Sequence, residues 1–236
     1  MLLHLSLRQK LSAKPLRQSQ KKKTPREMSD PFYTPPRTQR PFYTLITPPT
    51  TEPISVEQAS AHLRVDSEDD LTYIEALIGV AREYVDSVTG RVAMHSHHRV
   101  SSNSWVGLTG PEFLDTVNLY RSPLTAVSHV KYYPDGSNVL TTMPSTDYRV
   151  ITGSLPGMVQ FIVDLPTVED RVDAIQITFT AGQTVSSAVS PGQRHAVQLL
   201  TAHLYENRVP VGNITSELPY SLKALIEQQK IGGWFV

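Results

Sequence analysis

Residues 55–90 read Ser55-Val-Glu-Gln-Ala-Ser-Ala-His-Leu-Arg-Val-Asp-Ser-Glu-Asp-Asp-Leu-Thr-Tyr-Ile-Glu-Ala-Leu-Ile-Gly-Val-Ala-Arg-Glu-Tyr-Val-Asp-Ser-Val-Thr-Gly90. This stretch predicts two consecutive helices, a short one and a long one. Ser55 and Gln58 have the spacing of a capping box, in which the serine side chain accepts a hydrogen bond from the backbone N–H three residues later and the glutamine side chain reaches back. The first helix is therefore expected to begin directly after Ser55.

The long helix is predicted between Ser67 and Gly90. Ser67 is its expected N-cap, and the acidic run 68–70 suits the positive end of a helix dipole. Gly90 is expected to end the helix in the left-handed conformation. The apolar residues recur at spacings of three and four and form one stripe, which consists of Leu71, Ile74, Leu77, Ile78, Ala81, Val85 and Val88.

The composition is that of a folded protein. The chain has 236 residues, of which 39% are apolar and 19% charged, enough for one sizeable core or for a core with an inserted subdomain. Because there is no cysteine, disulfides, thiolate metal sites and cysteine nucleophiles are excluded. No apolar run approaches the roughly 20 residues that a membrane helix needs, so no membrane partner is predicted.

The total charge is neutral, but positive and negative charges are concentrated in different parts of the chain. Residues 1–52 hold ten Lys and Arg against three acidic residues, a net charge of +7, and the rest of the chain carries −7. Residues 1–52 are also rich in Lys, Gln, Ser, Thr and Pro and show little apolar periodicity, which predicts a basic, Pro-rich extended arm. A basic arm on an acidic body indicates contact with something anionic, such as a neighbouring copy of the same body.

Two features of this arm leave alternatives open. Met28-Ser-Asp-Pro has the form of a natural start, in which case residues 1–27 are an upstream extension. The unit Pro-Phe-Tyr-Thr occurs twice, at Pro31 and at Pro41. Its aromatic residues Phe32 and Tyr33 either anchor the arm in a groove or belong to a semi-rigid linker that covers its own body.

The middle of the chain reads as β-structure. Pro134-Asp-Gly136 is expected to form a turn, because proline fixes φ and glycine accepts a positive φ. Apolar and polar residues alternate in several short runs. About six strands are predicted, within residues 92–100, 113–121, 123–133, 139–140, 148–151, 158–163 and 174–180.

Helices are predicted again towards the C-terminus. Ser190 caps a helix that has Pro191 in its first turn and extends to Arg208, and a last helix runs from Leu218 to Ile231. Helices thus bracket a β-rich middle, which predicts an α+β fold that is mainly α, with a helical bundle formed by the N- and C-terminal helices and an inserted β-rich subdomain. The expected parts are the arm (1–52), the N-terminal helices (53–90), the β-rich insertion (91–182) and the C-terminal helices with a tail (183–236).

Residues that carry chemistry are few. The motifs of serine hydrolases, P-loops, dinucleotide-binding folds and zinc proteases are all absent, so neither an enzyme nor a cofactor is predicted. His95, His97 and His98 form the most metal-like cluster, with His95 and His97 on one face of a strand. No third ligand stands at a typical spacing, and a solvated polar strand is the alternative interpretation.

Both ends of the chain hold further candidates for contact. Lys21, Lys22 and Lys23 can bind nucleic-acid phosphates, although no aromatic platform stands beside them. The sequence ends in Gly-Gly followed by Trp234, Phe235 and Val236, and bulky apolar residues are costly to leave in water. These three residues are expected either to fold back onto the core or to insert into a partner.

Several segments, in this order along the chain, resemble the head–tail connector (adaptor) family of tailed bacteriophages. The resemblance runs from about Pro53 to Phe235 and leaves the N-terminal arm without a counterpart. Besides residues 55–90, it rests on Pro123-Leu-Thr-Ala-Val-Ser-His-Val-Lys-Tyr132, Asp147-Tyr-Arg-Val150, Ile175-Gln-Ile-Thr-Phe-Thr-Ala-Gly182, the helix from Ser190 that ends in Tyr205-Glu-Asn-Arg208, and Leu218-Pro-Tyr-Ser-Leu-Lys-Ala-Leu-Ile226.

The resemblance implies a structural virion protein and not an enzyme. Members of the family form a homo-oligomeric ring, usually twelve-fold, in the neck between capsid and tail, after assembly in the host cytoplasm. The ring docks under the portal protein, extends the DNA channel and offers a surface to a stopper or tail-completion protein. Genomic DNA would pass without sequence-specific binding, since an acidic wall repels phosphates. The expected portal contacts are Trp234, Phe235 and Val236, with Lys21, Lys22, Lys23, Phe32 and Tyr33 as further partner contacts.

Overall fold

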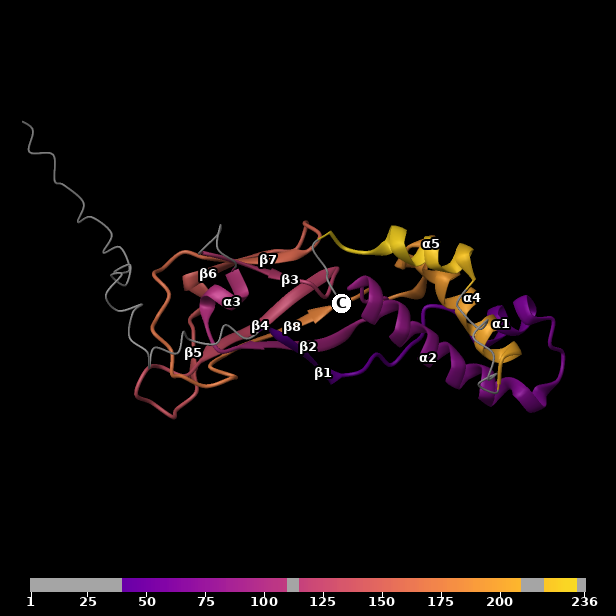
Figure 1. The fold of residues 1–236 in the computed structure, drawn as a ribbon, viewed down its shortest axis with the longest axis horizontal. Coiled ribbons are helices and arrows are strands. Elements are labelled where there is room, and N and C mark those ends of the chain that lie inside the picture. Colours follow the sequence, from indigo (N-terminus) through magenta and orange to yellow (C-terminus); the bar gives the residue numbers. More distant parts are fainter. Residues whose placement is uncertain (1–39, 110–114, 209–218, 233–236) are drawn as a thin grey trace, which may run out of the picture. The chain divides into compact units, whose positions relative to one another are not determined.

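A computed structural model describes residues 40–109, 115–208 and 219–232 of the chain (Figure 1). The α-helices of this part are α1 (Val56–Leu63), α2 (Leu71–Thr89), α3 (Trp105–Thr109), α4 (Pro191–Glu206) and α5 (Tyr220–Gln229). Its strands are β1 (Phe42–Thr47), β2 (Ser96–Ser102), β3 (Thr116–Leu119), β4 (Leu124–Tyr132), β5 (Thr141–Thr142), β6 (Tyr148–Ile151), β7 (Gly157–Phe161) and β8 (Ile175–Ala181).

The strands form two antiparallel sheets. The larger sheet has the order β1-β2-β8-β4-β5, and the smaller one has the order β3-β7-β6. Strands β2 and β8 are far apart in the sequence but pair along their whole length, from Ser96 opposite Ala181 to Ser102 opposite Ile175. Both sheets contribute to one apolar core, whose fully buried members include Val100, Val117, Val130, Val159, Ile177 and Phe179.

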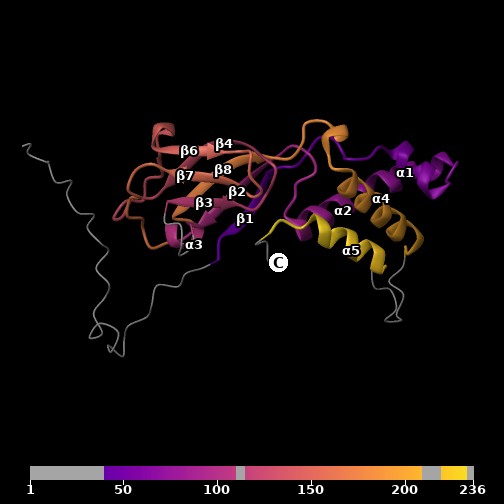
Figure 2. The ribbon, with the colours of Figure 1, turned by 90° about the horizontal axis from the view of Figure 1, so that it is seen from above.

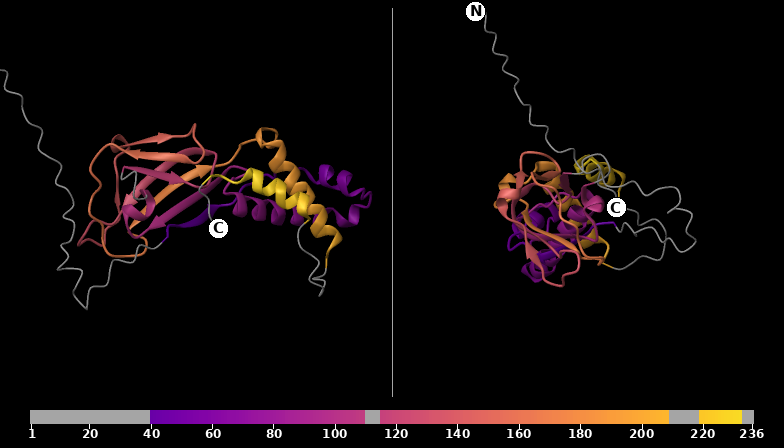
Figure 3. Two further views of the ribbon diagram at one scale, coloured as in Figure 1. Left: turned by 45° about the horizontal axis from the view of Figure 1, so that its top comes forward. Right: turned by 90° about the vertical axis from the view of Figure 1, so that its left-hand side faces the viewer.

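Helices α1, α2, α4 and α5 surround a second apolar core. Figure 3 shows α5 beside α2 and α4. The stripe predicted on the long helix supplies the centre of this core, through Ile74, Ile78, Ala81 and Val85. The other helices contribute Ala59, Val197, Leu200, Leu222 and Ile226. None of the helices in the described ranges is both long and apolar enough to span a bilayer.

The predicted caps at Ser55, Gly90 and Ser190 are confirmed. Asp70 and not Ser67 is the N-cap of α2, and α4 and α5 end within two residues of the predicted positions. The Ser55 side chain accepts a hydrogen bond from the Gln58 N–H, and the Gln58 side chain accepts one from the Ser55 N–H, each at 3.2 Å. Ser67 caps a short 3₁₀ turn, Glu68–Asp70, which leads into α2. Gly90 ends α2 with a φ of 72°. Ser190 caps α4, and its Oγ accepts a hydrogen bond from the Gln193 N–H.

The prediction of an α+β fold is confirmed, but a mainly α fold and a helical-bundle architecture are not supported. Of the residues that the structure describes, 38% are in helices and 28% in strands, and the two antiparallel sheets carry a core of their own. The error has a physical cause. Strand β2 reads Ser-His-His-Arg-Val-Ser-Ser, so most of its buried positions hold polar residues. A strand of this kind lacks the alternation of apolar and polar residues by which strands are predicted from sequence, and the amount of β-structure is underestimated.

Strand β1 lies within the segment predicted as an arm. Phe42 pairs with Ser101 of β2 and Leu45 pairs with His98, with an irregularity between Leu45 and Thr47. Figure 2 shows β1 next to β2. The last part of the Pro-rich segment is therefore a sheet strand, while the division of the chain at residues 52, 90 and 182 stays a prediction.

Most of the other predicted strands are present with shifted ends. The turn at Pro134-Asp-Gly136 is confirmed, with a φ of 72° at Gly136. The return strand after it is Thr141–Thr142, not residues 139–140, and it pairs with Lys131 and Tyr132 of β4. Helix α3 was not predicted, because its five residues are too few to show an apolar period. Its local signal is Ser104, whose Oγ accepts a 3.3 Å hydrogen bond from the Gly107 N–H.

Candidate functional site

The residues predicted to contact partners lie outside the described part of the chain. Those of the arm are Lys21, Lys22, Lys23, Phe32 and Tyr33, and those of the C-terminal end are Trp234, Phe235 and Val236. Their contact roles therefore stay predictions. The described residues bring together three other features: the histidines at β2, a buried polar network, and the edge of the larger sheet.

The predicted pair His95 and His97 shares one face, with ring centroids 5.6 Å apart in an edge-on arrangement. His98 lies on the opposite, buried face. Its ring stacks on Phe179 at 5.8 Å, and its Nε2 is 2.9 Å from Ser96 Oγ. Within the described ranges, no three His, Cys, Asp or Glu residues are grouped so that they could hold a metal ion. The three histidines therefore do not form one site.

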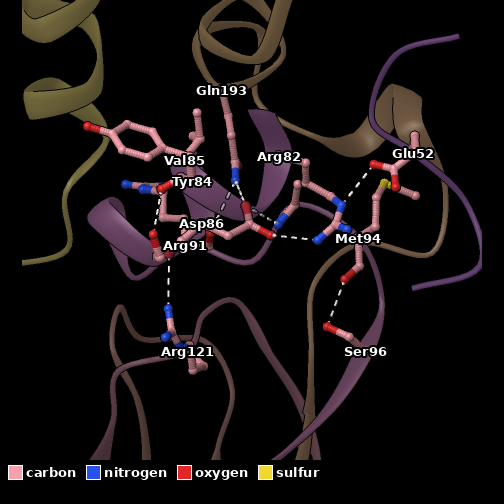
Figure 4. A network of polar contacts seen from close by, with 12 residues as sticks. Glu52, Arg82, Tyr84, Val85, Asp86, Arg91, Met94, Ser96, Arg121 and Gln193 are labelled. Atoms are coloured by element: carbon pink, nitrogen blue, oxygen red, sulfur yellow. Dashed lines mark hydrogen bonds and ion pairs between the residues drawn. The ribbon is translucent and has the colours of Figure 1, made fainter. Parts of the chain in front are cut away.

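A buried polar network joins the helices to the larger sheet, and Asp86 of α2 lies at its centre (Figure 4). Asp86 Oδ1 accepts hydrogen bonds of 3.1 Å from the Ala93 N–H and from Gln193 Nε2. Asp86 Oδ2 lies 3.9 Å from Arg82 Nη1. The backbone carbonyl of Asp86 accepts a 3.0 Å bond from Arg121 Nη1. The network thus connects α2 with α4, with the segment before β2 and with the loop between β3 and β4.

The same network reaches the segments that lead into and out of the helices. Arg82 Nε donates a 2.8 Å hydrogen bond to Glu52, which precedes α1. Arg91 Nε donates a 2.6 Å bond to the backbone carbonyl of Gln229, at the end of α5. Buried polar groups that have partners hold their elements in one arrangement. The network therefore fixes how the helices meet the sheet.

Burial shifts the pKa of two groups in this region in opposite directions. It raises the pKa of Asp86 to about 7, against the opposing charge of Arg82 and the hydrogen bonds from Ala93 and Gln193. It lowers the pKa of His98 to about 4, and the positive charge of Arg121 adds to this effect. Burial penalises the charged form in both cases.

Sequence reasoning missed this network. The only local signal is the spacing of Arg82 and Asp86, which is that of an i,i+4 ion pair on a helix surface. Of the other partners of Asp86, Ala93 lies seven residues away, beyond the end of the helix, while Arg121 and Gln193 are far from it in the sequence. No pattern along the chain identifies them.

Strand β1 is attached to the body through Tyr43. The Tyr43 hydroxyl accepts a 3.1 Å hydrogen bond from the Tyr120 N–H, and its ring lies edge-on to Phe179 with centroids 6.4 Å apart. Burial raises the pKa of this hydroxyl to about 12. The other large side chains of β1 are open to solvent: Phe42 is 45% exposed, Leu45 50% and Ile46 44%.

Replacing Tyr43 tests this attachment. We expect Tyr43→Phe to lower the free energy of unfolding by about 1 kcal/mol, because the half-buried Tyr120 N–H loses one acceptor while the ring contact with Phe179 remains. Tyr84→Phe is the control, since Tyr84 is 41% exposed on α2, and we expect no change for it. Urea denaturation measures both. Equal stabilities of the two variants would contradict the role given to Tyr43.

A groove of about 530 Å³ lies between α1 and the start of α4. His62, Arg194 and His195 are among its lining residues, but none of these lining residues is a carboxylate, a hydroxyl or a thiol. The titratable groups of this lining are thus two imidazoles and one guanidinium.

The fold is shared with chains of solved phage-like particles. A chain from the neck of an empty GTA particle computed with C6 symmetry aligns with a TM-score of 0.64 at 20% identity, over 80% of this chain and 95% of that chain. This chain has the fold of a GTA neck chain. A chain from the virion of a native gene transfer agent (GTA) particle aligns with a TM-score of 0.62 at 19% identity, over 80% of this chain and 95% of that one.

A third chain, from the neck of a native GTA particle computed with C12 symmetry, aligns with a TM-score of 0.54 at 21% identity, over 79% of this chain and 96% of that chain. In each case nearly the whole of the other chain is covered, so the likeness concerns the complete fold and not one subdomain. No protein-family model and no curated protein matches the chain.

Proposed function

We propose that this chain is a structural subunit of the neck of a phage-like virion, between capsid and tail, where its copies assemble into a ring. The observation that carries this proposal is the shared fold, which extends over 95% of a chain from a GTA neck computed with C6 symmetry. The order of the adaptor-like segments between Pro53 and Phe235 supports the same conclusion independently, because it was read from the sequence alone.

The more specific role is that of a head–tail connector, or adaptor. The ring would dock under the portal protein, extend the DNA channel and present a surface to a stopper or tail-completion protein. The net charge of −7 on residues 53–236 suits a wall that DNA passes without adhering. This role consists of contacts between proteins, and the proposal assigns neither a reaction nor a cofactor to the chain.

Exposed apolar residues on several elements suit a subunit with neighbours on more than one side. On α2, Val80 is 54% exposed, and on α5, Tyr220 is 87% exposed. On β6 of the smaller sheet, Val150 and Ile151 are each 37% exposed. Single exposed apolar residues are common on any protein, so these positions support the proposal only together with the fold.

Native mass spectrometry of the purified protein, alone and mixed with the portal protein of the same genome, tests the proposal. We expect a ring, or stoichiometric capture by portal rings. A protein that stays monomeric in both samples and does not bind the portal protein would refute the adaptor role.

The C-terminal contact is tested separately. We expect Trp234→Ser with Phe235→Ser to weaken portal binding roughly 100-fold or more, because two buried aromatic side chains contribute about 1.5–3 kcal/mol each. Trp234→Phe with Phe235→Leu keeps these positions apolar and is the matched control, with binding close to that of the unchanged protein. Undiminished capture of the serine variant would remove these residues from the interface.

A further inference from the structure

Strand β1 forms one edge of the larger sheet, and in the described part of the chain its only strand partner is β2. Native proteins usually protect such an edge with charged residues, with proline inside the strand or with a very short strand. The opposite edge, β5, is protected in this way, since it consists of Thr141–Thr142 alone. Strand β1 has six residues, Phe42-Tyr-Thr-Leu-Ile-Thr47, and none of them is charged or a proline.

The solvent-exposed side chains of β1 are apolar as well. Phe42, Leu45 and Ile46 are each between 44% and 50% exposed and lie within five residues of one another. An uncovered strand edge with apolar side chains favours pairing with another strand. Among the described residues, β2 alone pairs with β1, which leaves the other edge of β1 open to a further strand.

The sequence offers a segment that matches β1. The first three residues of β1, with the proline before them, read Pro41-Phe-Tyr-Thr44, and the same tetrapeptide occurs once more, at Pro31-Phe-Tyr-Thr34. Phe, Tyr and Thr all favour strands. Strand β1 shows that this tetrapeptide pairs in an antiparallel sheet of this protein. We propose that residues 31–34 of a second copy of this chain add as a strand to the open edge of β1.

The prolines around residues 31–34 are compatible with this pairing. Alternate residues of a strand direct their N–H and C=O groups to the same side. Phe32 and Thr34 can therefore both donate to β1, while Tyr33 faces away from it. Pro31 and Pro35 stand two residues before and after Tyr33, so their backbone groups face the outer side as those of Tyr33 do. Proline has no N–H group, and an edge strand tolerates proline where the missing N–H would face outwards.

The sequence between the two tetrapeptides favours pairing between two copies of the chain over pairing within one copy. Residues 35–40, Pro-Pro-Arg-Thr-Gln-Arg, separate the two tetrapeptides. Hairpin loops usually have two to five residues, and Pro35-Pro36 favours an extended polyproline conformation over a tight reversal. Six extended residues reach roughly 20 Å, a distance that suits a neighbour in a ring. The inference thus rests on the proposed ring assembly.

Because the chain contains no cysteine, engineered thiols test the pairing without background. Thr34→Cys and Thr44→Cys are made as separate full-length variants and mixed under mild oxidation, alone and with the portal protein. Thr44 is exposed on β1. We expect a mixed disulfide at least about tenfold more abundant than with Asn138→Cys as the partner, since pairing raises the local thiol concentration to the millimolar range. Asn138 is exposed in the loop between β4 and β5 and is the matched control.

The alternatives give different products. A disulfide within one molecule of the double variant Thr34→Cys, Thr44→Cys, without the mixed disulfide, would place the segment on its own β1 and overturn the inference. Disulfide dimers of Thr44→Cys alone would mean that two β1 edges pair directly, which also overturns it. Absence of every disulfide from variants that still form a ring would refute the arm contact but not the adaptor function. A missing ring would refute the adaptor function by itself.

Discussion

Asp86→Asn is expected to make the stability rise with pH between about 4 and 6.5 more steeply than in the unchanged protein, by about 1 kcal/mol for each pH unit. The reason is that two buried groups oppose each other in this range. One is Asp86 in the network between helices and sheet, and the other is His98 in β2. Removing one of them leaves the contribution of the other visible.

Asp86 makes the protein less stable as the pH rises. Its carboxyl has a pKa of 3.8 in its ordinary state and about 7 in the folded protein, with burial as the main cause. Between these values the folded state binds the proton more tightly than the unfolded state does. The stabilisation is complete below pH 3.8 and is lost as the pH rises to 7, by at most about 1.4 kcal/mol for each pH unit.

His98 has the opposite effect. Its pKa is lowered from 6.5 to about 4, by burial first and then by the charges of Arg121 and His97. The unfolded state therefore binds more protons between pH 4 and 6.5, and the stability rises with pH by a similar amount for each unit. The two slopes nearly cancel up to pH 6.5.

The measurement is a series of urea denaturation curves at pH 4.5, 5.5 and 6.5. Asn at position 86 still accepts hydrogen bonds from Ala93 and Gln193 but does not titrate, so we expect the unfolding free energy of this variant to increase by about 1 kcal/mol more for each pH unit than that of the unchanged protein. His98→Phe keeps an aromatic ring beside Phe179, and we expect the reverse difference. Profiles of both variants that run parallel to that of the unchanged protein would show that neither group titrates as inferred.

The sequence predicted what depends on neighbouring residues. The capping box of Ser55 and Gln58 and the left-handed end at Gly90 are decided within a few residues, and all are present in the structure. The share of helix was predicted too high and the share of strand too low. The apolar stripe of α2 is a strong periodic signal, whereas the strands hold buried polar residues such as Ser101 and Thr180. Apart from the hairpin around Pro134-Asp-Gly136, the pairing of the strands depends on residues far apart in the chain and could not be predicted.

The polar network was beyond sequence reasoning for the same reason. Asp86 takes its partners from α4, from the segment before β2 and from the loop before β4. A carboxylate next to the apolar stripe of an amphipathic helix is ordinarily a surface residue. Asp86 is buried only because α4 and the segments that lead into the sheet pack against this side of α2. The fold class was thus predictable in outline, while the junction that holds its two parts together was not.

The largest loss of stability is expected for Gly182→Ala, directly after β8, where the chain passes close to the backbone of Met94. Gly182 has a φ of 96°, and a Cβ there would lie 2.3 Å from the carbonyl oxygen of Met94. The residues around it are paired, since Gln183 N–H donates to the Ala93 carbonyl at 3.1 Å and His95 N–H donates to the Gln183 carbonyl at 2.9 Å. The methyl group therefore meets backbone that is held in place.

We expect Gly182→Ala to lower the unfolding free energy by about 3 kcal/mol or more, of which the positive φ accounts for about 1–2 kcal/mol and the enforced backbone shift for about 1–3 kcal/mol. Gly136→Ala separates the two causes, because Gly136 also has a positive φ, of 72°, but has nothing within 4 Å of its Cβ position. Its expected cost is about 1 kcal/mol. Equal costs at both positions would show that the contact with Met94 relaxes freely.

The two substitutions are also connected through the network. Displacing Met94 moves the neighbouring Ala93, whose N–H donates to Asp86 Oδ1. Loss of that hydrogen bond removes one of the influences that lower the pKa of Asp86, so its pKa in Gly182→Ala is expected to rise further. Above pH 6.5, where His98 no longer opposes Asp86, the stability of Gly182→Ala should therefore go on falling to a higher pH than that of the unchanged protein. The profile of Gly136→Ala should follow the unchanged protein throughout.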